Sequence, residues 1–265
     1  VKMTILDKII FEKKIEIENK KRSLSIETFN KSPMFKCEKK SLSKSLRKNK
    51  FGIIGEYKRK SPSNPNINLK SDVEKIAKGY EKAGCAGISV LTNEKFFGGS
   101  VNDLSIVKSS CNLPILRKEF IVDIFQIYES KAIGSDAILL IASCLKKDEL
   151  KSFSKIANEL DLEVLLEIHT AEELDKIPAK NVSIIGVNNR NLNDFSVSIE
   201  NSIKISNYIP KNICKISESG ISNISSIKKL QNIGYNGFLI GEHFMKSLNP
   251  ELTAHKFIQR LKNEN

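Results

Sequence analysis

The chain has 265 residues, of which 40% are hydrophobic and 28% are charged, and its formal net charge is +12. This length suffices for one large domain or two small ones, and no apolar run is long enough to span a bilayer. Lys8, Glu12 and Lys13 interrupt the first residues, which therefore do not resemble a signal peptide. We expect a cytoplasmic protein with no membrane partner.

The cysteines and histidines give no indication of a metal centre. The five cysteines lie far apart without a CxxC pair, which predicts reduced thiols. The three histidines show no metal-ligand spacing. We therefore expect no metal site.

The positive charge is concentrated near the N-terminus. Residues 1–50 contain 15 Lys/Arg and 6 Asp/Glu, a net of +9, whereas the other 215 residues contain 28 and 25, a net of +3. A basic arm can bind nucleic acid, but this one has neither an aromatic pair of the RNA-recognition type nor a helix-turn-helix pattern. We favour a solvated lysine-rich helix and no nucleic-acid partner. A nucleic-acid-binding module is the alternative.

An amphipathic helix is predicted at the start of this arm, and Ser32-Pro33 interrupts the pattern. We expect residues 1–50 to pack against the rest of the chain rather than to form a separate domain. The apolar positions of the predicted helix are Ile5, Ile9, Ile10 and Ile15.

Eight short apolar runs follow the arm, at intervals of 20 to 35 residues. Each run is nearly continuous rather than alternating, which is typical of strands buried on both faces. The runs centre on Ile53, Ile88, Ile115, Ile138, Val164, Ile184, Ile216 and Leu239.

Helical patterns lie between these runs. Ser222 is predicted to cap a helix that follows the seventh run. Eight strand–helix units predict an α/β fold, a (β/α)8 TIM barrel over residues 51–265 with an N-terminal helical extension over residues 1–50. A doubly wound open sheet is the alternative, but no Gly-rich dinucleotide fingerprint follows the first strand. The clearest helical patterns are Val73, Ile76, Ala77 and Tyr80, then Leu150, Phe153, Ala157 and Leu160.

Polar residues follow six of the eight predicted strands, at the end where a barrel of this kind holds its active site. Glu56 and Lys58 share a face of the first strand. Any one of these residues is ordinarily explained as a structural ion pair, but acids and bases that meet in a partly dry cavity shift one another's pKa values, as acid–base catalysis requires. Strands 2 and 4 end in Leu91-Thr92 and Ile141-Ala142-Ser143, which we expect to form the pocket wall. The other polar residues are Lys118, Glu167, Asn188, Arg190, Glu218, Ser219 and Glu242.

Small residues follow strands 7 and 8. Ser219-Gly220 and Ile240-Gly241-Glu242 would expose backbone N–H groups near a helix start, where many barrels hold a phosphate. Plain turns are the alternative.

These segments together resemble the indole-3-glycerol-phosphate synthase family. The most specific are Glu-x-Lys-x-x-Ser-Pro-Ser from Glu56 to Ser63 and the strand 3 lysine, Lys118. The resemblance implies ring closure, decarboxylation and dehydration of 1-(2-carboxyphenylamino)-1-deoxyribulose 5-phosphate to indole-3-glycerol phosphate in tryptophan biosynthesis. It implies a small anionic substrate and no cofactor or metal. The other matching segments are Ile5–Ile10, Ser89–Thr92, Phe97–Ser100, Pro114–Phe120, Leu166–Ile168, Gly186–Arg190, Glu218–Gly220 and Leu239–Gly241.

The resemblance also implies roles for these residues. Lys118 would be the general acid for the ketone, with Glu56 orienting it and Lys58 binding the substrate carboxylate or sharing proton transfer. Glu167 would serve dehydration, and its apolar neighbours should help it keep or accept a proton. Asn188, Glu218 and Ser219 would hold the substrate hydroxyls and the reacting centre, and Arg190 would lie nearby. Phe97 and Phe120 would flank the anthranilate ring. The phosphate would be bound by Ser61, Gly220, Gly241 and the backbone N–H of Glu242, whose side chain would point away.

The chain departs from the family pattern in two places. Glu119 stands where Asp is usual, and Asn64-Pro65-Asn66 replaces a glycine-containing loop. A sugar-phosphate isomerase on the same barrel, such as phosphoribosylanthranilate isomerase, is an alternative that would carry a Cys/Asp pair instead of Glu56 and Lys118. An inactive barrel is a third possibility, against which the full set of acid–base candidates argues. The sequence leaves the oligomeric state open, and we expect a monomer.

Overall fold

The computed structural model describes residues 3–178, 180–191 and 194–264. Eight parallel strands close into a barrel in chain order, and β1 pairs with both β2 and β8. Each predicted apolar run lies in one strand, so the TIM barrel is confirmed and the open sheet is excluded. The strands are β1 (Gly52–Tyr57), β2 (Gly87–Leu91), β3 (Ile115–Lys118), β4 (Ala137–Ile141), β5 (Glu163–Ile168), β6 (Ile184–Asn188), β7 (Cys214–Glu218) and β8 (Gly237–Ile240).

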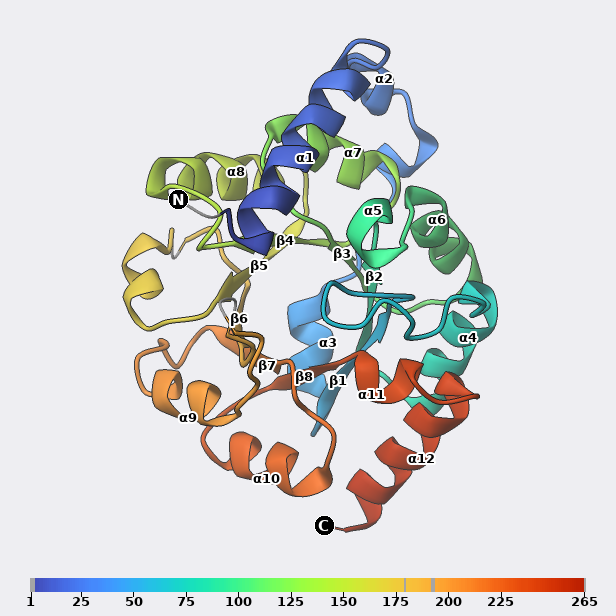
Figure 1. Cartoon of the computed structure of the whole chain (residues 1–265), viewed down its shortest axis with the longest axis vertical. Coiled ribbons are helices and arrows are strands. Elements are labelled where there is room, and N and C mark those ends of the chain that lie inside the picture. The colour runs from blue at the N-terminus through green and yellow to red at the C-terminus, as the bar shows by residue number, and fades with distance from the viewer. Residues whose placement is uncertain (1–2, 179, 192–193, 265) are drawn as a thin grey trace.

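Helices surround the barrel, and their apolar faces cover the outer surface of the strands (Figure 1). The predicted helix α4 begins where the Asp72 side chain accepts hydrogen bonds from two backbone N–H groups, and it buries the four predicted positions. The helices after β1 are α4 (Val73–Ala83), α5 (Glu94–Phe97), α6 (Val101–Ser110), α7 (Ile124–Ala132), α8 (Lys147–Glu159), α9 (Glu200–Ser206), α10 (Ile224–Asn232), α11 (Glu242–Met245) and α12 (Pro250–Asn263), with the 3-10 turn η2 (Glu172–Lys176) between β5 and β6.

The predicted cap of α10 is wrong by one residue. The Asn223 side chain, not that of Ser222, accepts a hydrogen bond from the Ser226 backbone N–H at 2.8 Å. Both residue types cap helices well, so composition alone does not decide between neighbours.

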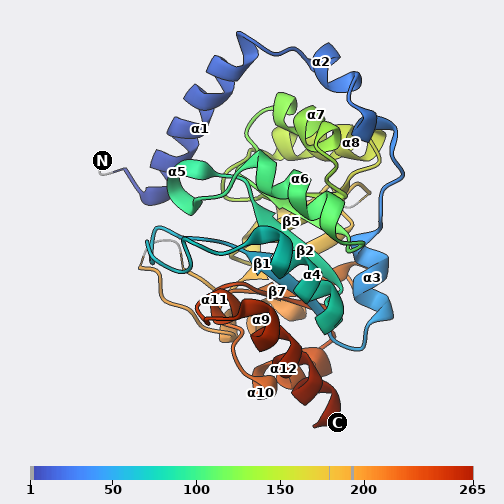
Figure 2. The same cartoon turned by 90° about the vertical axis from the view of Figure 1, so that its right-hand side faces the viewer.

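The N-terminal arm contains α1 (Ile5–Lys21), α2 (Ile26–Asn30), the 3-10 turn η1 (Pro33–Lys36) and α3 (Leu42–Lys48). Figure 2 shows α1 and α3 on opposite sides of the barrel. Leu42 and Leu46 of α3 are fully buried within the cluster that fills the barrel interior. Helix α3 therefore closes the end of the barrel at which the strands begin.

The buried face of α1 differs from the predicted one. Ile9, Lys13 and Ile17 are buried, whereas Ile15 is 45% exposed. The apolar pattern missed this face because its central residue is a lysine. Within the described ranges, no helix is long and apolar enough to cross a membrane.

Candidate active site

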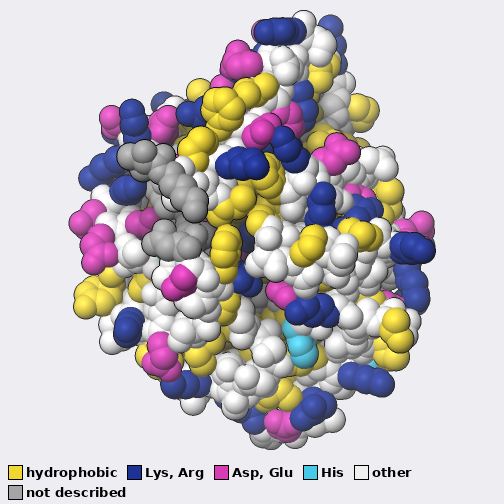
Figure 3. All heavy atoms as spheres, viewed as in Figure 1, with side chains coloured by type: hydrophobic (Ala, Val, Ile, Leu, Met, Phe, Trp, Pro, Cys, Tyr) yellow, Lys and Arg dark blue, Asp and Glu magenta, His cyan; other side chains and the backbone are white. Residues whose placement is uncertain are grey.

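A cavity of about 500 Å³ opens at the C-terminal ends of the strands. Figure 3 shows this face of the molecule, with a hollow near its centre. Every site residue predicted from the sequence lines this cavity. They are Glu56, Lys58, Ser61, Phe97, Lys118, Phe120, Glu167, Asn188, Arg190, Glu218, Ser219, Gly220, Gly241 and Glu242.

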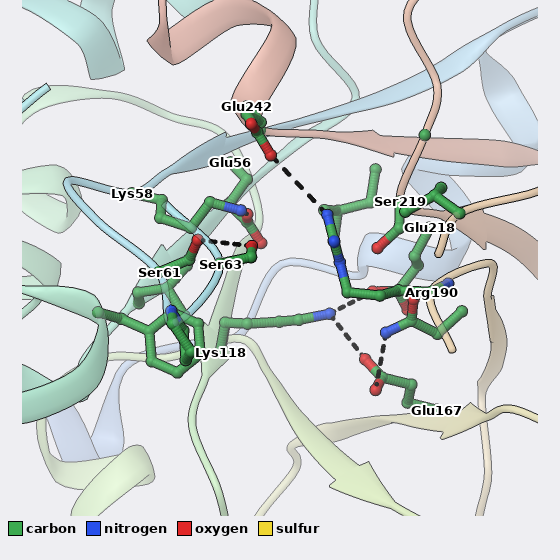
Figure 4. A pocket seen from close by; sticks show the side chains of 18 of the residues that line it. Glu56, Lys58, Ser61, Ser63, Lys118, Glu167, Arg190, Glu218, Ser219 and Glu242 are labelled. Atoms are coloured by element: carbon green, nitrogen blue, oxygen red, sulfur yellow. Dashed lines mark hydrogen bonds and ion pairs between the residues drawn. The ribbon is translucent and has the colours of Figure 1, made fainter. Parts of the chain in front are cut away.

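Lys118 extends from β3 across the cavity and contacts two carboxylates (Figure 4). Its Nζ lies 3.1 Å from Glu167 Oε2 and also forms an ion pair with Glu218 Oε2. Burial acts to lower the pKa of Lys118, but the nearby charges of Glu218, Glu167 and Glu56 outweigh it and raise that pKa above its usual value. Lys118 is therefore an ammonium group at neutral pH.

The two carboxylates have different electrostatic surroundings. Burial acts to raise the pKa of Glu167, but Lys118, His169 and a hydrogen bond from Asn188 Nδ2 (3.1 Å) outweigh it, so the pKa is lowered. Burial raises the pKa of Glu218 to about 7; Lys118 opposes this rise and the charge of Glu167 adds to it. Of the two expected behaviours, keeping or accepting a proton, the lowered pKa favours accepting one, because Lys118 and the hydrogen-bond donor stabilise the carboxylate.

Glu56 and Lys58 form an ion pair of 2.7 Å at the end of β1, on the shared face that strand alternation predicts. Glu56 does not orient Lys118 by direct contact as expected. The ion pairs of Lys118 within the described residues are with Glu167 and Glu218, and Glu56 reaches Lys118 only through its charge.

One wall of the cavity is aromatic. The rings of Phe97 and Phe120 lie 6.0 Å apart, in a tilted arrangement. Leu91 of β2 and Ile9 of α1 also line the cavity. A flat apolar group such as a benzene ring fits against such a surface.

A different part of the wall carries hydroxyls, small residues and cations. The hydroxyls of Ser61 and Ser63 are 3.2 Å apart. Ser219 and Gly220 both have positive φ angles, of 67° and 73°. Exposed backbone N–H groups and the cationic side chains of Arg190 and Lys246, which also line the cavity, are suited to binding a phosphate.

The side chain of Glu242 does not point away from the cavity as expected. Its carboxylate lies 3.8 Å from Arg190 (Figure 4). It also lies 2.5 Å from Lys246. Burial acts to raise the pKa of Glu242, but the Lys246 ammonium outweighs it and the pKa is lowered. This carboxylate thus compensates the positive charges of Arg190 and Lys246.

Sequence reasoning missed several lining residues, among them His169, Ser63, Lys246 and Ile9. His169 lies two positions after Glu167, so strand alternation could have identified it. Its Nε2 is 3.6 Å from Glu167 Oε1, and neither ring nitrogen has a hydrogen-bond partner within the described residues. Nothing in the local pattern indicates that α1 reaches the cavity.

Some predicted wall residues lie elsewhere. Leu91 and Ile141 line the cavity, whereas Thr92, Ala142 and Ser143 do not. Thr92 instead donates a hydrogen bond of 3.0 Å to Glu119, which itself lines the cavity.

A closed parallel barrel that gathers ammonium and carboxylate groups at the C-terminal ends of its strands defines the class of (β/α)8-barrel enzymes. Within that class, the chain belongs to the indole-3-glycerol phosphate synthase family, whose model matches residues 6–257.

Similar proteins agree with this membership. The chain is 42% identical to an indole-3-glycerol phosphate synthase of Bacteroides thetaiotaomicron, over 97% of this chain and 98% of that protein. It is 41% identical to one of Thermoanaerobacter pseudethanolicus, with the same coverage. A tryptophan synthase complex of Pyrococcus furiosus contains a chain of similar fold, with a TM-score of 0.60, 14% identity, and coverage of 80% of this chain and 98% of that one.

Proposed function

We propose that this cavity binds 1-(2-carboxyphenylamino)-1-deoxyribulose 5-phosphate, closes its ring and releases indole-3-glycerol phosphate, carbon dioxide and water. The chain is a decarboxylating carbon–carbon lyase of tryptophan biosynthesis, as its family membership implies. Membership in this family also argues against the isomerase alternative. The observation that carries the proposal is the buried Lys118 ammonium between the carboxyl groups of Glu167 and Glu218, in a cavity with an aromatic wall.

Lys118 serves as the acid of ring closure. The ring carbon that bears the carboxylate attacks the ketone carbon, and Lys118 gives its proton to the ketone oxygen. The Lys58 ammonium binds the substrate carboxylate until carbon dioxide leaves and the ring is aromatic again. Glu56 orients Lys58 through their ion pair.

Glu167 serves as the base of dehydration. Its lowered pKa makes it a carboxylate, able to accept a proton from the methylene carbon beside the nitrogen. The hydroxyl leaves as water with a proton from Lys118. Because loss of a carboxylate as carbon dioxide consumes one proton overall, Lys118 must be reprotonated, and Glu218, with a pKa of about 7, holds a proton at the right place.

The two ends of the substrate lie on opposite sides of these groups. Phe97 and Phe120 flank the anthranilate ring, and Asn188 and Ser219 hold the sugar hydroxyls. The phosphate contacts Ser61 and backbone N–H groups at Gly220, Gly241 and Glu242. Arg190 and Lys246 turn from the Glu242 carboxylate to the phosphate, whose double charge competes for them.

We also propose that the chain acts as a cytoplasmic monomer in which residues 1–50 and 51–265 form one domain, without nucleic acid or membrane partners. The cysteines are free, which supports a reducing compartment. Light scattering of the purified protein tests the oligomeric state directly.

The decisive experiment follows indole fluorescence as the purified protein acts on this substrate with no metal added. The chain has no tryptophan, so the background emission is low. Lys118→Met should abolish turnover while the circular dichroism spectrum stays that of the wild type. Activity near the wild-type level in this variant would refute the role of Lys118.

A further inference from the structure

We propose that Lys13, on the N-terminal helix α1, is a positioning residue that acts on Lys118 through Glu119. The inference rests on the proposed function, since it takes Lys118 as the acid of the reaction. Neither Lys13 nor Glu119 is assigned a step in that reaction.

Lys13 and Glu119 form a buried ion pair between the arm and the barrel. Lys13 Nζ lies 3.1 Å from Glu119 Oε2, and each side chain is only 2% exposed. A lysine is almost never buried to this extent unless it is paired. The second partner of Lys13 is Glu16, at 2.7 Å, which is half-exposed on the same helix.

The Glu119 carboxylate also accepts hydrogen bonds from residues beside Lys118. Its Oε2 also accepts from Thr92 Oγ1 at 3.0 Å, and its Oε1 accepts from the Phe120 backbone N–H at 2.9 Å. The Thr92 backbone N–H in turn donates to the Lys118 carbonyl at 3.3 Å. One carboxylate thus holds Phe120 of the aromatic wall directly and the Lys118 carbonyl through Thr92.

Alternation along β3 points Lys118 into the cavity and Arg117 away from it. Glu119 follows the last residue of the strand and lines the cavity beside Lys118. Arg117 forms an ion pair with Glu129 of α7, and Lys20 of α1 contacts the same Glu129 at 3.2 Å. Helix α1 therefore supplies an ammonium group to Glu119, one neighbour of Lys118, and to Glu129, the ion-pair partner of the other neighbour.

Loss of Lys13 would leave a buried carboxylate with neutral donors only. Such a group takes up a proton or admits water, and in either case its hydrogen bonds to Thr92 and Phe120 change. A displacement of about 1 Å at a reacting group can cost on the order of 100-fold in rate. We expect the turnover number to fall much more than the substrate affinity, because most of the proposed binding contacts, at Lys58, Asn188 and the phosphate, do not involve Glu119 or Phe120.

The test measures kcat and KM of full-length Lys13→Met at a temperature where it is folded. We expect kcat to fall at least tenfold and KM to change less than threefold. Lys13→Met/Glu119→Gln removes both charges and should recover most of the lost kcat. Lys13→Arg, which keeps the charge, should stay within about threefold of the wild type.

Two control variants separate positioning from general loosening of the arm. Ile17→Ala removes a buried side chain of α1 without touching Glu119, and Lys21→Met removes the surface pair with Asp123. Both should keep kcat within about twofold. An equal fall in Ile17→Ala, or an unchanged kcat in Lys13→Met, overturns the inference.

If Lys13→Met does not fold, the kcat of the single variant Glu119→Gln tests the inference instead. We expect this kcat to be reduced, and a kcat equal to that of the wild type would contradict the inference. A wild-type protein inactive on the substrate would instead refute the proposed function. The two failures are therefore distinguishable.

Discussion

Glu218 and Glu167 both contact Lys118, yet their pKa values shift in opposite directions. Asn188 donates a hydrogen bond to Glu167, whereas Glu218 Oε1 has no partner within the described residues. The charge of His169 and the Asn188 hydrogen bond both favour the carboxylate form of Glu167, while the charge of Glu167 favours a proton on Glu218. The cavity therefore has one carboxylate ready to act as a base and one carboxyl ready to return a proton.

The raised pKa of Glu218 predicts a pH-dependent stability. Its folded-state pKa of about 7 is above the ordinary value of 4.5, so the folded protein binds this proton more tightly than the unfolded chain. The resulting stabilisation is complete below pH 4.5 and is lost as the pH rises through 7. The wild type should therefore lose about 3 kcal/mol of unfolding free energy between pH 4.5 and pH 8, at 1.36 kcal/mol per pKa unit, and Glu218→Gln should not lose it. Urea unfolding of both proteins at several pH values measures this, and a constant difference contradicts it.

Glu167→Gln should slow product formation by about 100-fold or more, since an acid–base group is lost. The amide cannot accept the methylene proton, so dehydration should be affected more than ring closure. Carbon dioxide release should then run ahead of indole fluorescence in a single turnover. Glu172→Gln, on the exposed η2 turn, is the control and should behave as the wild type. If both signals slow together, the assignment of Glu167 to dehydration is wrong.

At the level of elements, a glycine on β6 leaves space for the side chain of a site residue on the neighbouring strand β7. A Cβ on Gly186 of β6 would lie 2.1 Å from Glu218 Oε1. Gly186→Ala should push Glu218 away from Lys118 and reduce kcat at least tenfold, with about 1–3 kcal/mol of destabilisation from overpacking.

Gly79→Ala is a matched control for Gly186→Ala. Its Cβ would lie 2.1 Å from Glu251 Cβ, between α4 and α12, which is outside the cavity. It should lose similar stability and keep its kcat. Enzyme assays combined with thermal melts of both variants make the comparison, and equal losses of kcat would show that the effect is not specific to Glu218.

The elements differ in how well the sequence predicts them. All eight strands were predictable because each is buried on both faces and is therefore a continuous apolar run. Which side chains meet at their ends was predictable only as a group, since the barrel brings all strand ends together. The partner of Lys118 is decided by side-chain reach across the barrel, which no local pattern contains. The buried face of α1 was missed because the partner of Lys13 is 106 residues away.

At the scale of the whole molecule, the basic charge of the arm is in part matched by the barrel. Lys13, Lys20 and Lys21 of α1 pair with Glu119, Glu129 and Asp123, respectively. These lysines are therefore less available to an external polyanion than the net charge of +9 implies. This supports the proposal that the arm does not bind nucleic acid.

The other end of the arm, helix α3, packs closely against the end of the barrel at which the strands begin. A Cβ on Gly52 or Gly237 would approach the Leu46 side chain of α3 to 2.8 or 2.6 Å, and one on Gly87 would approach Leu42 to 2.4 Å. The strands thus begin with glycines where the α3 leucines enter the barrel. Leu46 is fully buried in the interior cluster, with Ile216 among its members.

Arm and barrel should accordingly unfold as one unit. Leu46→Ala should cost about 2–5 kcal/mol, the usual range for a buried leucine, and should lower the stability of the entire molecule. All five tyrosines lie outside residues 1–50, but Tyr128 stacks on Phe35 of the arm. In a Tyr128→Phe background, tyrosine fluorescence therefore reports on the barrel, while far-ultraviolet circular dichroism reports on arm and barrel. The two signals should give coincident urea transitions, shifted together in Leu46→Ala and unshifted in Leu24→Ala, whose side chain is 37% exposed in the arm. If the arm were a separate domain, Leu46→Ala would produce an early transition in circular dichroism while the tyrosine signal stayed in place.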